Sequence, residues 1–230
     1  MKAMILAAGL GKRMRPLTDT LPKPLLRAGG KPLIQYHIER LREAGITDVV
    51  INTAYLGEKI RQFLGGGREL GVTIVYSEEP QPLETGGAVN RALNLLGPEP
   101  FLLVNADIWT DYSLAHLSRW SMPQHILGHL VFVSNPQHNR GGDYTLDESG
   151  YVVPQCDEGL TFSGVSMLSP GLIEHYPRRR ETFPLREALD FAIANRQLTG
   201  EIYDGDWRDI GTPERLQQLD RDLSVRVPPD

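Results

Sequence analysis

The chain has 230 residues, 40% of them hydrophobic and 23% charged, with a formal net charge of −5, a composition typical of a folded globular protein with one domain. The negative charge argues against nucleic-acid binding through an overall basic surface, and the single cysteine, Cys156, excludes a disulfide framework and a cysteine-rich metal site. No apolar run approaches the roughly 20 residues that span a bilayer, and the first one is too short for a signal peptide, so we expect a cytoplasmic protein without a membrane partner.

In the first half of the chain, short apolar segments alternate with segments of helical periodicity. Strands are predicted at residues 3–8, 48–53, 72–76 and 101–104. Helices are predicted at residues 33–44, 57–64 and 86–96. Strands that alternate with helices of about ten residues indicate crossover connections and a parallel sheet covered on both faces.

The second half of the chain departs from this alternation. Strands with little helix between them are predicted at residues 126–134, 144–146, 151–153 and 161–168. Two late helices are predicted at residues 185–195 and 213–223. Glycine, asparagine, aspartate and proline are frequent in the loops here, which favours antiparallel additions. The predicted fold is therefore α/β, one domain over residues 1–230, with a Rossmann-like, mostly parallel central sheet flanked by helices and small antiparallel additions.

A glycine-containing loop follows the first predicted strand and ends in two cations, Lys12 and Arg13. Gly9 and Gly11 leave backbone N–H groups open to phosphate oxygens, although an ordinary tight turn uses the same residues. The loop is not a Rossmann fingerprint, because Met14 stands where the third glycine would be. It is not a Walker loop either, because no serine or threonine follows Lys12. The pattern indicates either a phosphate site of another kind or a structural turn.

Three isolated charged residues are further candidates for chemistry. Prolines on both sides of Lys23 fix its backbone, which suits a lysine with a defined direction but also a rigid surface loop. Asp107 follows the most apolar predicted strand, where ligands of open parallel sheets bind. A carboxylate there suits Mg²⁺, which takes one or two carboxylates plus phosphate oxygens, and Asp209 is a candidate second ligand. Asp107 is also suited to cap a turn or a helix.

Several segments together resemble the sugar-1-phosphate nucleotidyltransferases. They are residues 6–18 (LAAGLGKRMRPLT), 22–25 (PKPL), 83–88 (LETGGA), 105–107 and 207–213 (WRDIGTP). This joint match spans almost the whole chain and is far more specific than a glycine loop alone. Within that family, the short chain and residues 84–87 (ETGG) are most similar to the N-acetylmuramate-1-phosphate uridylyltransferases of bacterial cell-wall recycling.

The resemblance implies that a sugar-1-phosphate oxygen attacks the α-phosphorus of UTP and that pyrophosphate leaves. Such a transfer depends on positioning and charge neutralisation more than on covalent catalysis. The resemblance implies catalytic roles for Arg13, on the departing pyrophosphate, and for Lys23, between the reacting phosphates. It implies Asp107 and Asp209 as ligands of the cofactor Mg²⁺. The implied nucleotide-binding residues are Leu6, Ala7, Ala8, Gly9, Gly11, Lys12, Arg13, Lys23, Glu79, Glu84, Thr85 and Gly86.

The sugar-binding residues that the resemblance implies are Asn105, Gly142, Asp143 and Ser163. Many relatives carry Glu-Lys-Pro in the sugar region, where this chain has residues 153–156 (VPQC), so those sugar contacts do not carry over. N-Acetylmuramate differs from N-acetylglucosamine by a lactyl ether with a charged carboxylate, which favours a cation in its site. Arg140 is the candidate for that cation.

By the same resemblance, residues 1–110 mainly bind the nucleotide, residues 111–205 mainly bind the sugar, and residues 206–230 contain the second metal ligand and a closing helix. Two alternatives stay open. The same chemistry fits glucose or mannose 1-phosphate with UTP, dTTP or GTP, because Glu84 stands where many relatives have a glycine in the base-binding loop. A nucleotide-sugar-binding regulator would keep the fold without catalysis.

Overall fold

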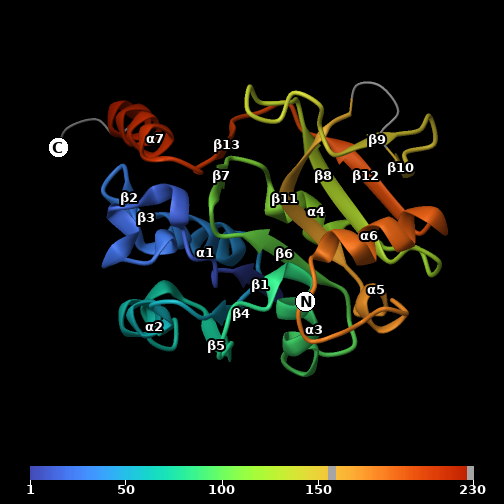
Figure 1. Ribbon diagram of the computed structural model, residues 1–230, viewed down its shortest axis with the longest axis horizontal. Coiled ribbons are helices and arrows are strands. Elements are labelled where there is room, and N and C mark those ends of the chain that lie inside the picture. Colours follow the sequence, from blue (N-terminus) through green and yellow to red (C-terminus); the bar gives the residue numbers. More distant parts are fainter. Residues whose placement is uncertain (155–158, 227–230) are drawn as a thin grey trace.

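The computed structural model describes residues 1–154 and 159–226, so that Cys156 and half of the segment 153–156 lie outside the described residues. Its frame is a seven-stranded sheet in the order β12-β8-β11-β6-β1-β4-β5 (Figure 1). The strands are β1 (Ala3–Leu6), β4 (Asp48–Thr53), β5 (Thr73–Glu78), β6 (Phe101–Asn105), β8 (Gly128–Val133), β11 (Thr161–Leu168) and β12 (Leu198–Ile202). β11 runs antiparallel to β6 and β8, and every other neighbouring pair is parallel. The start of β11 therefore lies at the edge where β1, β4 and β6 end.

Three antiparallel ribbons lie outside this sheet. They are β2 (Arg27–Ala28) with β3 (Lys31–Pro32), β7 (Ile108–Thr110) with β13 (Trp207–Asp209), and β9 (Tyr144–Leu146) with β10 (Val152–Pro154). The predicted strands 126–134 and 161–168 differ from expectation, because they form β8 and β11 of the central sheet itself. Both are buried along almost their whole length, so they need helices on both faces.

Helices cover the two faces of the sheet and the glycine-loop side of the molecule. They are α1 (Leu33–Glu43), α2 (Gly57–Leu64), α3 (Glu84–Leu96), α4 (Leu114–Arg119), α5 (Gly171–Glu174), α6 (Leu185–Ala194) and α7 (Pro213–Arg226). The apolar faces of α1, α2 and α4 share one buried cluster with Ala3 and Ile5 of β1. Those of α3, α5 and α6 share another with Met4, whose side chain points to the opposite face of the strand.

The C-terminal helix returns to the first part of the chain. Figure 1 shows α7 beside β2 and β3, and its Leu219 is buried in a third cluster with Met14 and Trp109. The Asp220 carboxylate accepts a hydrogen bond from the backbone N–H of Gly29 at 2.8 Å. Because α7 follows β13 directly, this packing fixes the position of β13, which carries Asp209. No helix within the described ranges is long and apolar enough to cross a bilayer.

Most predicted elements are confirmed, with shifts at their ends. β1 ends at Leu6 rather than at residue 8, which leaves residues 7–11 free to form a loop, and α3 begins at Glu84, two residues early. β12 was missed. Its central Gly200 lies so close to β8 that a Cβ there would stand 2.7 Å from a ring carbon of Phe132. The close approach requires glycine, and because glycine is unusual inside a strand, the sequence of this segment does not look like one.

Candidate active site

A cavity of about 370 Å³ opens at the carboxyl ends of β1, β4 and β6. Of the predicted residues, it is lined by Leu6, Ala7, Ala8, Gly9, Gly11, Lys12, Arg13, Lys23, Glu79, Glu84, Thr85, Asn105 and Asp107. These residues come from segments far apart in the sequence. Every predicted nucleotide-binding residue except Gly86 is among them, at the sheet edge where open α/β folds bind ligands.

The glycine loop presents free donors to this cavity. Among the described residues, no acceptor engages the backbone N–H groups of Gly9, Gly11 and Lys12. Gly11 has a φ of +59°, and a Cβ there would stand 2.9 Å from Cγ2 of Thr18, so that glycine is needed for both its backbone and its packing. Free N–H groups beside the side chains of Lys12 and Arg13 have the chemistry that suits an anion.

Lys23 and Asp107 face each other in the cavity. The Lys23 side chain is about 10% exposed, and its Nζ lies 2.8 Å from Oδ2 of Asp107, whose side chain is 42% exposed. Beneath them, His37 is buried, and this burial lowers the pKa of His37 to about 4. Because a carbonyl oxygen can only accept, Nε2 of His37 donates to the carbonyl of Ile108 at 2.9 Å, which holds the backbone next to Asp107.

The antiparallel pairing of β7 with β13 brings Asp209 beside Asp107. Asp209 pairs with Ile108, and the backbone N–H of Ile210 donates to the carbonyl of Asp107 at 2.9 Å. Oδ2 of Asp209 lies 2.5 Å from Nη1 of Arg215 and 3.0 Å from Nε2 of His138. Sequence analysis missed both partners of Asp209, because one comes from α7 and the other from the loop after β8.

Gly211 separates this carboxylate from the glycine loop. A Cβ on Gly211 would stand 3.0 Å from Oδ2 of Asp209 and 3.2 Å from Nη1 of Arg13. The missing side chain thus lets Arg13 approach the second aspartate. Gly211 lines the cavity, whereas Asp209 lies directly behind it.

The two aspartates suit a hard divalent cation. Mg²⁺ takes oxygen ligands, and it usually binds through one or two carboxylates together with phosphate oxygens. Lys23 pairs with Oδ2 of Asp107 and Arg215 with Oδ2 of Asp209, which leaves Oδ1 of each carboxylate open to a metal within the described part of the chain. In the described part of the chain, no group of three or more histidine, cysteine, aspartate or glutamate side chains forms a metal cage. The donor set therefore fits a metal that a nucleotide helps to hold.

A buried polar network shapes the opposite wall of the cavity. Asn52 accepts a hydrogen bond from the backbone N–H of Ala7 at 2.7 Å and donates one to Oε1 of Glu79 at 2.7 Å. Oε2 of Glu79 accepts from the backbone N–H of Leu83 at 2.9 Å. The network joins the loop after β1 to the loop before α3. Glu79 thus positions the loops, and Asn52 is a site residue that sequence analysis missed.

We expect Glu79→Gln to lower the free energy of unfolding by about 1–3 kcal/mol, the scale for one unsatisfied buried group. Glutamine has one acceptor oxygen for the two donors that Glu79 serves. Chemical denaturation measures the change. Glu78→Gln is the matched control, because the Glu78 side chain is 63% exposed and its ion pair with Arg61 is worth little. Equal stability of the Glu79 and Glu78 variants would contradict this role.

The segment Thr85 to Gly87, at the start of α3, packs against the segment that leads into α6. Its glycine N–H groups donate to the carbonyl of Phe183 at 2.9 and 3.0 Å, and the Thr85 hydroxyl accepts from the N–H of Leu185 at 2.9 Å. A Cβ would stand 2.5 Å from the Phe183 ring at Gly86 and 2.2 Å from the Glu181 carbonyl oxygen at Gly87. Gly86, predicted to bind the nucleotide, is therefore a packing residue outside the cavity lining.

Gly87→Ala is expected to destabilise the fold by about 1–3 kcal/mol, as overpacking of a tight contact does. The methyl group would force the chain at Glu181 away from α3. Thermal unfolding measures the effect. Gly66→Ala is the control, because no atom lies within 4 Å of the Cβ position at Gly66. A Gly87→Ala protein as stable as the Gly66→Ala protein would refute the close approach.

A second cavity of about 210 Å³ adjoins the first. Leu6, Thr85 and Asn105 line both. The remaining walls of the second cavity are Asp143, Tyr144, Phe162, Leu185, Arg186 and Leu189. Of the predicted sugar-binding residues, the structure thus places Asn105 and Asp143 in a cavity wall.

The other predicted sugar-binding residues lie outside the two linings. Ser163 is buried, its Oγ accepts from the N–H of Val165, and its carbonyl accepts from Nε1 of Trp207. Gly142 packs against Gly159 with a φ of +72°. Arg140 is exposed and lines neither cavity.

Comparison with known proteins identifies the family. Residues 2–152 match the family model described as nucleotidyl transferase. The chain belongs to the nucleotidyl transferase family. This membership confirms the resemblance drawn from the sequence motifs, and it makes the chain an enzyme of the nucleotidyltransferase class.

This nucleotidyltransferase is 46% identical to the N-acetylmuramate alpha-1-phosphate uridylyltransferase of Neisseria meningitidis serogroup B, over 95% of this chain and 96% of that one. It is 30% identical to the probable mannose-1-phosphate guanylyltransferase 3 of Oryza sativa subsp. japonica over 93% of its length, and it spans 62% of that relative. A solved structure, a putative glucose-1-phosphate thymidylyltransferase from Bacillus anthracis in complex with sucrose, matches with a TM-score of 0.87. It is 20% identical, with 97% of this chain and 95% of that chain covered, and it confirms the fold class.

Proposed function

We propose that this nucleotidyltransferase transfers a uridylyl group from UTP to N-acetylmuramate 1-phosphate in peptidoglycan recycling, forming UDP-N-acetylmuramate and pyrophosphate. The observation that carries the proposal is the 46% identity to an N-acetylmuramate alpha-1-phosphate uridylyltransferase across nearly the full length of both chains. Two adjoining cavities that share Leu6, Thr85 and Asn105 supply the arrangement that a reaction between two bound substrates needs.

The larger cavity takes UTP in this proposal. The base lies over residues 6–8 and against residues 79–85, which the Asn52–Glu79 network holds together. The triphosphate lies on the free N–H groups of the glycine loop, with Lys12 and Arg13 beside it. Arg13 neutralises the charge on the departing pyrophosphate. Among the described residues, no hydrogen bond or ion pair occupies its guanidinium, so all its donors are open to the phosphates.

The transfer itself needs no proton acceptor. An oxygen of the sugar 1-phosphate, already negatively charged, forms a bond to the α-phosphorus, and the bond from that phosphorus to the bridging β-phosphate oxygen breaks. The electron pair leaves on pyrophosphate. Lys23 lies between the reacting phosphates and stabilises the charge that builds up there, since its ammonium group is held in a fixed, nearly buried position.

Mg²⁺ is the proposed cofactor, held by Asp107 and Asp209 together with the phosphates. When bound, it supplies charge neutralisation and orientation of the phosphate oxygens. The residues around it keep the aspartates in place: β7–β13 pairing fixes their backbones, and Arg215 and His138 orient the Asp209 carboxylate. With the metal and phosphates bound, Lys23 would add positive charge beside them from the position that it holds next to Asp107.

A pyrophosphate-release assay across substrates tests the proposal. UTP, dTTP, GTP and ATP are each combined with the 1-phosphates of N-acetylmuramate, N-acetylglucosamine, glucose and mannose. The expected result is the highest kcat/KM for UTP with N-acetylmuramate 1-phosphate. A higher value for mannose 1-phosphate with GTP would favour the activity named for the 30% identical relative instead, and absence of release in every combination would indicate a regulator.

A further inference from the structure

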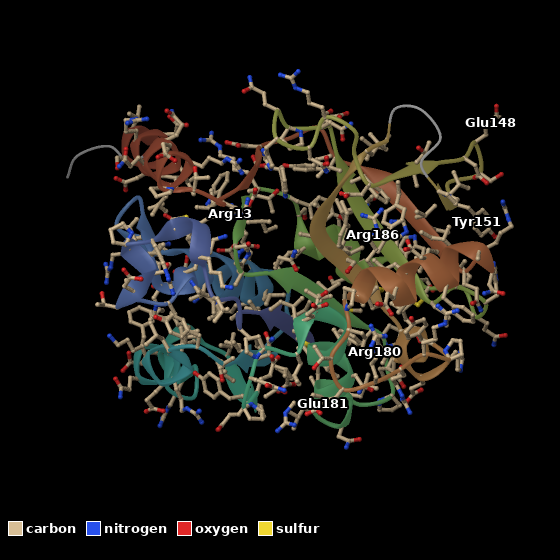
Figure 2. All side chains as sticks on the ribbon, viewed as in Figure 1. Arg13, Glu148, Tyr151, Arg180, Glu181 and Arg186 are labelled. Carbon is tan, nitrogen blue, oxygen red and sulfur yellow. The ribbon has the colours of Figure 1, made fainter. Side chains whose placement is uncertain are left out.

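One cation lies in the wall of the second cavity within the described part of the chain, namely Arg186 of α6. Figure 2 shows Arg186 on the orange helix α6 to the right of the centre of the molecule, with Arg13 to the left of the centre. Leu6, Thr85 and Asn105 form the border between the cavities, and Arg186 is not part of that border or of the first cavity. Arg186 therefore lies in the part of the second cavity that the first cavity does not share.

The guanidinium of Arg186 has donors to spare. Its nearest carboxylates are Asp143 and Asp190, both at 3.9 Å, which is longer than a hydrogen bond. The oxygens that face Arg186 are Oδ1 of Asp143 and Oδ2 of Asp190, while the other oxygen of each carboxylate accepts a hydrogen bond: Oδ2 of Asp143 from the N–H of Phe162 at 2.9 Å, and Oδ1 of Asp190 from the Tyr144 hydroxyl at 2.7 Å. The guanidinium also lies over the Tyr144 ring, with Cζ 5.3 Å from the ring centroid. Burial raises the pKa of Tyr144, so this hydroxyl stays a donor to Asp190. With its side chain 60% exposed, Arg186 can turn toward a ligand.

Beside Arg186, Asp143 and Tyr144, the wall of the second cavity is apolar. Phe162, Leu185 and Leu189 line the second cavity with it. A lactyl ether carries a carboxylate and a methyl group on the same carbon. Arginine binds a carboxylate through two parallel hydrogen bonds, and leucine and phenylalanine side chains bury a methyl group. This wall thus matches both substituents of a lactyl group.

We propose that Arg186 binds the lactyl carboxylate of N-acetylmuramate 1-phosphate and thereby selects this sugar over N-acetylglucosamine 1-phosphate. The inference rests on the proposed function. A sugar ring in the second cavity, with its 1-phosphate toward Lys23, extends its ring substituents toward α6. Arg140, the cation expected from the sequence, has no such access, because it lines neither cavity.

The test is the kcat/KM of Arg186→Ala with three acceptors: N-acetylmuramate 1-phosphate, its lactyl amide and N-acetylglucosamine 1-phosphate. The expected loss for the acid is about 10- to 100-fold, the range for one charge-assisted hydrogen bond. The amide and N-acetylglucosamine 1-phosphate carry no lactyl charge, so their values should change by less than about twofold. Arg186→Lys restores part of the activity with the acid, because it keeps the charge but loses the bidentate geometry.

Arg179→Ala is the matched control, since Arg179 is an exposed arginine outside both cavities, and it should leave all three values unchanged. Equal losses on all acceptors would overturn the proposal and assign Arg186 to the phosphate or to the fold. No loss, or a selective loss in Arg140→Ala instead, would overturn it as well. The assay of the unmodified enzyme with N-acetylmuramate 1-phosphate tests the proposed function separately. If that enzyme does not use this sugar phosphate at all, the proposed function is wrong, whatever the variants show.

Discussion

Replacing Lys23 with alanine is expected to lower kcat by about 10²–10³-fold, the scale for removal of one preorganised electrostatic stabiliser. Two features of the structure support so large an effect. The Lys23 side chain is only about 10% exposed, so its charge acts with little screening by water, and its Nζ lies 2.8 Å from Oδ2 of Asp107, which we propose as a metal ligand. The flanking prolines leave the backbone no freedom to bring another cation there.

Steady-state kinetics of Lys23→Ala separates the two possible roles of this lysine. An effect on kcat marks an interaction made in the transition state, whereas a change in KM alone would make Lys23 a uniform binder and contradict the account. Lys31→Ala is the matched control, because Lys31 also pairs with a carboxylate, Glu39 at 2.6 Å, but lies outside the cavity. Its kcat should stay close to that of the unmodified enzyme.

Asp107→Asn and Asp209→Asn are each expected to lower kcat by at least about 10²-fold, because a catalytic divalent cation contributes several kcal/mol. Asparagine keeps the shape and one acceptor oxygen, so the β7–β13 ribbon should survive, and circular dichroism can verify this. Direct titration of Mg²⁺ in the presence of a non-hydrolysable UTP analogue should show weaker metal binding in both variants.

Asp48→Asn is the control for these two substitutions, since Asp48 is an exposed residue at the amino end of β4, the opposite end from the cavity. It should change neither kcat nor metal binding. Full activity of the unmodified enzyme in excess chelator would refute the metal assignment, whatever the variants show.

Sequence analysis predicted those parts of the site that each carry a signal within a few consecutive residues. The glycine loop, Lys23 and Asp107 each follow a local signal: glycines after an apolar strand, flanking prolines, or a carboxylate at a strand end. A local signal can also mislead. Gly86 lies in a motif next to true lining residues, yet its N–H donates to Phe183 and its surface packs against that ring.

The residues that sequence analysis missed act through contacts between distant segments. Arg215 and His138 contact each other, at 3.3 Å between Nη1 and Nε2, as well as Asp209, and their separation of 77 positions leaves no pattern in the sequence. Asn52 looks like one more polar residue at the end of a strand, until its bonds to Ala7 and Glu79 are seen. Arg186 lies in the first turn of an ordinary amphipathic helix, and its place in a cavity wall depends on how α6 packs on the sheet.

The most direct test of the central claim is a competition experiment with product analysis. The enzyme receives UTP, dTTP, GTP and Mg²⁺ with equal concentrations of the 1-phosphates of N-acetylmuramate, N-acetylglucosamine, glucose and mannose, and mass spectrometry identifies the first nucleotide sugar formed. Under competition, product ratios report ratios of kcat/KM, which is the measure of specificity. The account predicts UDP-N-acetylmuramate as the main product. A different nucleotide sugar as the main product would contradict it.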